Sequence, residues 1–499
     1  MKSIKMNETE LYQKLTSLAD EITVRKEGKP VLVTDYADLV RRETWQQAWN
    51  TDTREVGPAH SVSGNIWSDA IERCLRENGA AYIPKLDEPI YIDRSIELQS
   101  GDQLIAHPEA EIRLKVGEVG VCMVRTSQIV SGAEHPVRMC EGADENILIE
   151  GGIWSDQNNE GRGRGGEYDQ AGGMPGSMGT FLLHNVSNVI VRDMIFRDCS
   201  PFAIQIGNAT DFLVENILFD EVADGVHVEG PAARGIIRHL RGKTNDDFIA
   251  LNAWDWNSSS ITFGPITDIL AEDFEMLPGY TWSEIRLLPG TKVFTSGEKV
   301  DCDISRCILR DIRGVHTFKI YDQPNIAFPE GDFADPIGKM TDLFFADIEV
   351  DTFKRSEYYD ASSDGVFDVG VDVDFMSIRD VRLNFRPGDD DVIPYLVSVG
   401  PKLLIWNRDP NPEDSGSCWR PPAEGDTADI EWVEVYNSRI NPVVKELTVG
   451  DVFIRDTEKP GTYLPCEDIA TLINERVVTH QDEAGEAVSR GRILALATH

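Results

Sequence analysis

A repeat of about 23 residues is the feature of this sequence that most limits how the chain can fold. Short apolar runs recur behind a polar residue, and three such anchors, Asn188, Asp211 and Arg234, are spaced 23 residues apart. Further copies of the pattern begin at Asn146, Asp268, Cys302, Asp342 and Phe375. A fixed period of about 20 to 50 residues indicates a solenoid, in which each repeat packs on its neighbours.

The residues of the repeat indicate strands. The apolar runs are rich in β-branched side chains, lack a helical period and are separated by Gly and Asn. Spacings of 32 to 42 residues elsewhere are expected where loops are inserted into a coil of the same size. We therefore predict an all-β fold, a right-handed single-stranded parallel β-helix. An ordinary β-sandwich with accidental spacing is the alternative.

The domain organisation follows from where the repeats begin and end. We predict an N-terminal polar and helical extension (1–64), the parallel β-helix (65–455) with an inserted excursion (401–440), and a short helical C-terminal tail (456–499). Within the extension, Glu10–Ile22 has a helical pattern. An amphipathic segment that ends at Gly79 is predicted to cap the first coil, because an open solenoid end exposes unpaired backbone.

The composition narrows the partners. A net charge of −38 argues against nucleic acid and anionic membranes, and no stretch approaches 18 apolar residues. The first residues lack the apolar segment of a signal peptide, so we expect a cytoplasmic protein. The eight cysteines form no CxxC or Cys/His cluster, so neither a metal nor another cofactor is predicted. A homo-oligomer is possible.

Two acidic motifs one repeat apart carry the chemistry. Ala-Asp-Gly-Val-His-Val (223–228) and Asn-Asp-Asp-Phe-Ile-Ala (245–250) align at an offset of 22 residues, which places Asp224 beside Asp246. Strands in a sheet lie about 4.8 Å apart, so the carboxyls of Asp224, Asp246 and Asp247 are expected to meet. Their repulsion raises at least one pKa and keeps a proton available, and an acid and a base flanking one bond serve glycoside hydrolysis.

The same motifs resemble the Asn-Thr-Asp-Gly and Gln-Asp-Asp pair of polygalacturonase-like glycoside hydrolases of family 28. The resemblance implies that Asp246 is the general acid and that Asp224 and Asp247 activate water in an inverting displacement. The chain departs from the family in the next two coils. Thr281-Trp-Ser-Glu-Ile-Arg stands where the family has Gly-His-Gly, and Thr317-Phe-Lys stands where it has Arg-Ile-Lys.

Alternation along the strands predicts which side chains surround the acids. If the apolar ladders face inward, an outward column contains Gln205, His227, Ile249, Arg286 and Lys319. Arg286 and Lys319 either bind a substrate carboxylate or neutralise the acid cluster. His227 either orients Asp224 or is an ordinary surface group.

Aromatic residues and insertions are further candidates. Trp254 and Trp282 could offer flat apolar faces to a sugar, or they could be ordinary turn residues. The Gly-rich segment 155–180 and the excursion 401–440 are the expected walls of a pocket closed at one end.

Three functions remain open at this point. The first is an inverting glycoside hydrolase, exo-acting on an oligosaccharide or polysaccharide that contains uronic acid. The second is a β-helix lyase or epimerase, in which the acids would bind Ca²⁺. The third is a non-catalytic carbohydrate-binding β-helix, although neighbouring carboxylates destabilise a fold that does not use them.

Overall fold

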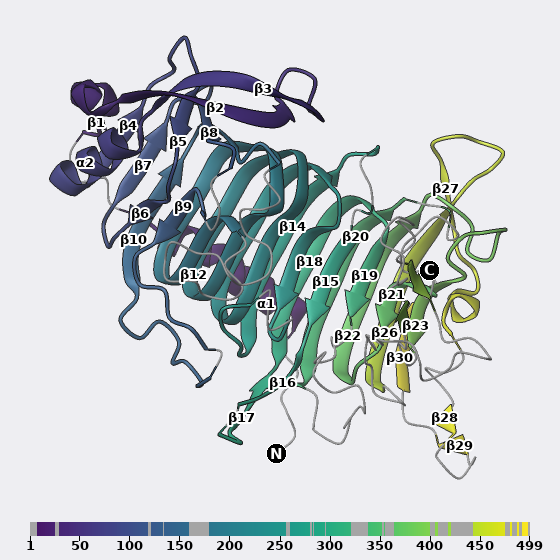
Figure 1. Ribbon diagram of the computed structural model, residues 1–499. Helices are drawn as coiled ribbons and strands as arrows, with labels where there is room; N and C mark the ends of the chain where they lie inside the picture. Colours follow the sequence, from purple (N-terminus) through teal and green to yellow (C-terminus); the bar gives the residue numbers. More distant parts are fainter. Residues whose placement is uncertain are drawn as a thin grey trace.

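The computed structural model describes most of the chain. The described residues are 7–24, 29–117, 121–132, 134–158, 179–255, 260–279, 282, 284–294, 296–320, 338–351, 354, 364–399, 405–407, 418–420, 443–474, 480–481, 487–488 and 492–497. Their strands stack in parallel coils from the N-terminal end to the C-terminal end (Figure 1). The predicted parallel β-helix is confirmed.

Three ladders of parallel strands form the walls. The first contains β4 (Ala80–Ile83), β7 (Gln103–Ala106), β10 (Asp144–Glu150), β12 (Gly179–Thr244), β14 (Ile266–Met276), β18 (Ile304–Val315), β20 (Met340–Val350), β22 (Val373–Leu383) and β26 (Val444–Arg455). The second begins with β5 (Ile90–Ile92), β8 (Glu111–Leu114) and β11 (Ile153–Ser155) and continues in the later halves of the long strands. The third contains β6 (Ile96–Leu98), β9 (Val124–Thr126), part of β12, β13 (Asp247–Asn252), β15 (Glu284–Leu288), β19 (Thr317–Ile320), β21 (Gly365–Val369) and β23 (Tyr395–Val399).

The other elements are short or lie outside these ladders. They are β1 (Val31–Leu32), η1 (Val33–Leu39), β2 (Arg41–Asn50), β3 (Glu55–Ile66), β16 (Gly290–Val293), β17 (Lys299–Cys302), β24 (Ile405–Asn407), β25 (Cys418–Arg420), β27 (Tyr463–Pro465), η4 (Ile469–Leu472), β28 (His480–Gln481), β29 (Ala487–Val488) and β30 (Arg492–Ala497).

The polar anchors of the repeat mark the corners between ladders. Asn188, Asp211 and Arg234 have φ values of 52°, 55° and 58°, in the left-handed region. Asn and Asp tolerate this region better than other side chains with a Cβ, which explains their recurrence. One anchor was misplaced: Ile269 pairs with Cys307, so the strand starts behind Arg306, at φ 55°, and not at Cys302.

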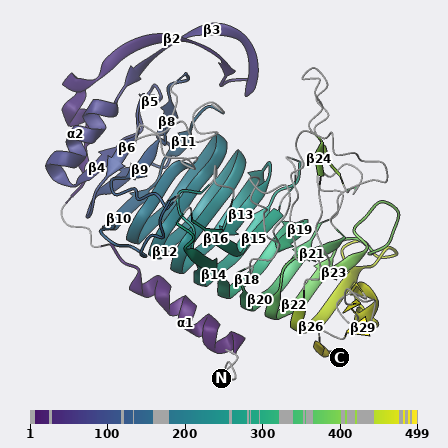
Figure 2. The same ribbon diagram turned by 60° about the horizontal axis from the view of Figure 1, so that its bottom comes forward.

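Two helices confirm the predictions for the N-terminal part. The capping helix α2 (Ser68–Asn78) ends at Gly79, which has a φ of 66°. Helix α1 (Glu8–Glu21) lies along the outside of the first ladder (Figure 2). Its buried leucines, of which Leu15 is one, pack on outward-facing apolar side chains of successive coils such as Ile236 and Leu270.

A long antiparallel hairpin was not predicted from the sequence. Strands β2 and β3 pair over most of their length and extend over the first coils (Figure 2). The tip is held by Arg54, whose Nη2 donates to Asp198 Oδ1 at 2.7 Å and whose Nη1 donates to Asp220 Oδ1 at 3.1 Å. The hairpin therefore braces the corner that leads from Asp220 to Asp224.

The predicted helical tail is wrong for the described part of 456–499. That part contains β27, the 3-10 turn η4 and three further strands. Strand β30 pairs with β26, so the chain end continues the first ladder, where backbone groups at the solenoid end find partners. Of the excursion 401–440, the structure describes the antiparallel pair β24–β25 alone.

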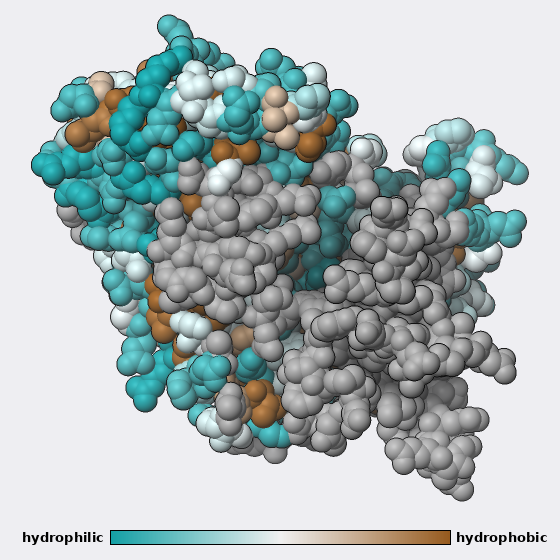
Figure 3. All heavy atoms as spheres, in the orientation of Figure 1, coloured by the Kyte–Doolittle hydropathy of each residue, from teal (hydrophilic) through white to brown (hydrophobic). Residues whose placement is uncertain are grey.

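The surface is mainly hydrophilic. Figure 3 shows apolar side chains in small scattered groups among the coloured residues. This agrees with the high net charge. Among the described helices, none combines the length and hydropathy needed to cross a membrane.

Candidate functional site

The register of the third ladder corrects the predicted alignment of the two motifs. Val226 pairs with Ile249 and Val228 with Leu251, an offset of 23 residues where 22 was predicted. Asp224 is therefore level with Asp247, and Asp246 lies one position earlier on the adjacent coil. The physical cause is an irregularity in the pairing of β13 with β15, between Asp247 and Ile249.

The irregularity also changes the outward column. The side chains of Phe248 and Ile249 both lie in the apolar core. Ala250 consequently pairs with His227 on one side and with Arg286 on the other, so it replaces Ile249 in the predicted column. Because the extra residue is absorbed in the core, Asp247 faces outward together with Ala250.

Arg286 joins two of the three predicted catalytic acids. Its Nε lies 3.0 Å from Asp247 Oδ2, and its Nη2 donates to Asp246 Oδ1 at 3.5 Å. The side chain of Asp247 is 0% exposed and that of Arg286 is 12% exposed, whereas that of Asp246 is 34% exposed. Asp246 is thus the member of this group that is most open to solvent.

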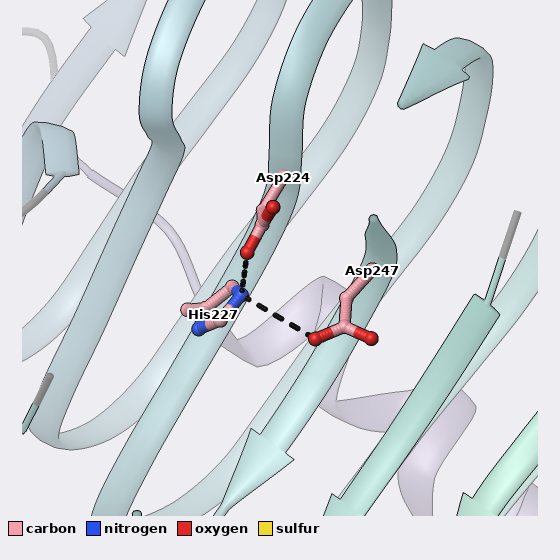
Figure 4. Close-up of side chains that lie close together, drawn as sticks. All are labelled: Asp224, His227 and Asp247. Carbon is pink, nitrogen blue, oxygen red and sulfur yellow. Dashed lines mark ion pairs between the residues drawn. The ribbon is translucent and has the colours of Figure 1, made fainter. Parts of the chain in front are cut away.

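His227 connects the third acid to the cluster. Its Nε2 lies 2.9 Å from Asp224 Oδ2 and 3.9 Å from Asp247 Oδ2, between the two carboxylates (Figure 4). The ring stacks on Phe202 with centroids 3.7 Å apart. Burial is the largest influence on its pKa and lowers it, so the imidazole is neutral at neutral pH.

The other ring nitrogen of His227 indicates which one carries the proton. Asn252 Nδ2 lies 3.3 Å from His227 Nδ1 and donates to Asp255 Oδ2 at 2.8 Å. The carboxylate of Asp255 needs a donor, so it orients the amide with its NH₂ group toward the ring. Nδ1 then accepts, and Nε2 holds the proton between Asp224 and Asp247.

A fourth buried carboxyl, Glu284, was missed in the sequence. It pairs with Asp247 across neighbouring strands and forms an ion pair with Lys319, and both side chains are 0% exposed. Thr317 Oγ1 also donates to Glu284 Oε1 at 3.3 Å. The available signal was strand alternation, because Glu284 stands two residues before Arg286 and shares its face. Buried Asp368, also missed, pairs with Lys319 on the following coil.

Burial and mutual repulsion raise the pKa values of two of these acids. For Asp247 burial is the largest cause and neighbouring Asp246 and Asp224 add to it, against the opposing charge of Arg286, which gives a pKa of about 7. Burial likewise raises the pKa of Glu284 well above its usual range, although Lys319 opposes this. The cluster therefore retains protons at a pH where isolated carboxyls are ionised.

Three of the predicted substrate-binding side chains are buried. Lys319 faces Glu284, as expected if it neutralises the acids. Gln205 has no exposed surface: it donates to Glu229 and accepts from the backbone N–H of Gly179 at 2.7 Å, so it anchors the start of β12. Trp254 lies in the apolar core, which leaves no ring face open to a sugar.

The remaining candidates are partly described. Trp282 is half-buried, and its backbone forms a hydrogen bond with His316, one coil further along. The greater part of the two predicted pocket walls, 155–180 and 401–440, lies outside the described residues.

The acids were also considered as metal ligands. Asp246, Asp247 and Glu284 offer oxygens within 4.8 Å of one another, and Asp224, His227 and Asp247 form a second such group. Calcium needs six to eight oxygen ligands. The guanidinium of Arg286 and the ammonium of Lys319 already occupy positions beside these carboxylates, so neither group fits a divalent cation.

Comparisons with known proteins give similar folds. No family model matches the sequence, and no curated protein matches it. Among solved structures, an exopolygalacturonase from Thermotoga maritima is similar over 88% of this chain and 91% of its own, with 11% identity and a TM-score of 0.49. The family 28 exopolygalacturonase of Yersinia enterocolitica covers 69% of this chain and 77% of its own, at 10% identity and a TM-score of 0.36.

An adhesin has a similar fold as well. PfbA, a surface adhesin of Streptococcus pneumoniae, covers 85% of this chain and 88% of its own, with 11% identity and a TM-score of 0.44. Since hydrolases and an adhesin are both similar to this chain, its function has to be argued from the side chains of the site.

Proposed function

We propose that the protein is a glycoside hydrolase that cleaves its substrate with inversion of configuration, by direct attack of water. The observation that carries this proposal is the group of Asp224, Asp246 and Asp247 on adjacent coils, in which a buried carboxyl has a pKa of about 7 beside a partly exposed one. Such a group combines a proton donor with ionised carboxylates.

Asp246 is proposed as the general acid. Its side chain is the most exposed of the three, so it can reach the oxygen of a glycosidic bond. One of its oxygens lies within 4.8 Å of an Asp247 oxygen, and two carboxyls this close titrate as a pair. The proton that the pair keeps up to a pH of about 7 is the proton that Asp246 delivers.

Asp224 and ionised Asp247 are proposed to hold the attacking water. Their facing oxygens lie on either side of His227 Nε2, which keeps both carboxylates in place (Figure 4). Inversion requires room for a water between acid and base, about 6.5–9.5 Å between the carboxyl groups in hydrolases of this type. Asp224, on the coil before Asp246, is the member of the base pair placed to leave that space.

Two measurements test the proposal. Asp246→Asn keeps the shape but cannot donate a proton, so kcat should fall by about three orders of magnitude or more with an unchanged unfolding midpoint. The control is Asp374→Asn, which removes an exposed carboxylate paired with Lys445. Proton NMR of the first product should show the anomer opposite to that of the bond cleaved. Retained configuration would contradict the mechanism.

The exo action expected from the sequence belongs to this proposal and is tested by the products. An exo enzyme releases one small sugar from the start, whereas an endo enzyme gives a ladder of oligosaccharides. A lyase is less well supported, because Arg286 and Lys319 lie where Ca²⁺ would bind the acids.

A further inference from the structure

The charge around Asp246 is strongly unbalanced. Five carboxyl groups line this part of the third ladder, namely those of Asp224, Asp246, Asp247, Glu284 and Asp368. Two cations, Arg286 and Lys319, belong to the same column. His227 adds no charge, because burial lowers its pKa. The described cluster therefore has a formal excess of three negative charges, and protons on two of the acids would still leave it negative.

Both cations are already engaged by the protein. The guanidinium of Arg286 is shared between Asp246 and Asp247. The ammonium of Lys319 lies against Glu284 on one side and follows Asp368 in register on the other, with no exposed surface. A substrate carboxylate at either position would have to displace a buried or half-buried carboxylate of the protein.

We propose that the sugar ring bound beside Asp246 is uncharged, so that this hydrolase cleaves neutral glycosides and discriminates against uronides. The proposal rests on the proposed function, since it concerns the substrate of the same site. It differs from the uronic-acid substrate expected from the sequence because Glu284 and Asp368, which occupy the cations, were not recognised there.

Neutral sugars suit the groups that remain accessible. Asp224 and Arg286 are each 12% exposed and Asp246 is 34% exposed, so a ligand meets carboxylate acceptors beside guanidinium N–H donors. A sugar hydroxyl can donate to a carboxylate and accept from Arg286 at the same time. A carboxylate has acceptors alone, and at an effective dielectric constant of about 20 a like charge at about 4–6 Å lowers affinity more than tenfold.

The test uses pairs of substrates that differ only at C6. The intact protein is incubated with the 4-nitrophenyl galactosides, galacturonides, glucosides and glucuronides of both anomeric configurations, and with the matching disaccharides. We expect kcat/KM to be at least tenfold higher for the uncharged member of the best pair. Equilibrium binding to Asp246→Asn, measured by calorimetry with the same disaccharides, should show the same preference.

A charge variant tests the cause of the preference. Glu284→Gln removes one negative charge and leaves Lys319 with fewer anionic neighbours, so the uronide-to-glycoside ratio of kcat/KM should rise about tenfold. The matched control is Glu458→Gln at an exposed turn, which should leave the ratio unchanged. If Glu284→Gln does not fold, the substrate pairs on the intact protein decide alone.

The outcomes separate the two proposals. Preferential cleavage or binding of the uronide by the intact protein overturns the uncharged substrate while leaving a glycoside hydrolase. A ratio that does not change in folded Glu284→Gln also overturns it. Absence of cleavage and of binding for every pair contradicts the proposed function itself.

Discussion

The ammonium group of Lys319 forms an ion pair with Glu284 although neither side chain has any exposed surface. The two residues lie on neighbouring strands, β19 and β15, at positions two residues out of register. Their pairing allows two ionisable groups to remain buried beside the acids of the candidate site.

Removal of one partner should therefore be costly. Lys319→Met leaves Glu284 buried without its cation and should lower the free energy of unfolding by about 3–5 kcal/mol. The double variant Lys319→Met/Glu284→Gln has no buried charge at this pair and should recover most of the loss. Urea unfolding followed by circular dichroism measures both. Lys445→Met, which breaks an exposed ion pair with Asp374, should cost less than about 1 kcal/mol. A single variant as stable as the wild type would contradict the role of the pair.

The imidazole of His227 should affect turnover more than folding. His227→Phe keeps the ring that stacks on Phe202 but removes the N–H between Asp224 and Asp247. A hydrogen bond to a charged group contributes about 1.5–3 kcal/mol, so kcat should fall about 10- to 100-fold with little change in KM. His239→Phe is the control, because His239 is an exposed histidine paired with Asp273. Equal losses in both variants would argue against a positioning role.

Activity should fall as the pH rises through about 7. The pKa of Asp247 is raised to about 7, mainly by burial, and the proton belongs to the Asp246–Asp247 pair. Above that pH the pair loses the proton that the general acid needs, so kcat/KM decreases on the alkaline side. Glu229 titrates at about 8 and could produce a similar limb. The pH profile of Glu229→Gln should therefore retain the limb, and a limb lost in this variant would reassign it.

Glu229 should instead make stability depend on pH. Burial raises its pKa to about 8, against hydrogen bonds from Gln205 and the backbone N–H of Ile261. The folded state then binds a proton more tightly than the unfolded state, so this contribution is full below about pH 4.5 and is lost as the pH rises to about 8. Relative to Glu229→Gln, the wild type should lose roughly 3–5 kcal/mol across that window. Urea midpoints from pH 5 to 9 measure the difference, and a constant difference would refute the shift.

Local sequence chemistry was sufficient for the architecture. The 23-residue spacing of Asn188, Asp211 and Arg234 reflects corners that need left-handed backbone, and the apolar runs behind them must face a common core. Both requirements repeat once per coil, so they are visible without knowledge of the neighbours. The amphipathic helices at Glu8–Glu21 and Ser68–Asn78 were readable for the same reason.

The acids could be found from the sequence but their alignment could not. Asp224, Asp246, Asp247, His227, Arg286 and Lys319 are all placed along one ladder, as alternation predicts. The one-residue irregularity at Phe248 arises because the core accepts two consecutive apolar side chains, which is a packing property of several coils together.

The sequence by itself determined that this chain is a parallel β-helix with acids concentrated on one wall, because strand alternation and repeat length are local. Only the tertiary structure decided which charges pair. Glu284 and Lys319 are far apart in the chain, and their burial and distance follow from the register of separate coils. Because ionisation depends on burial and on neighbours across strands, the pKa of Asp247 and the occupation of both cations could not be read from the residues in order.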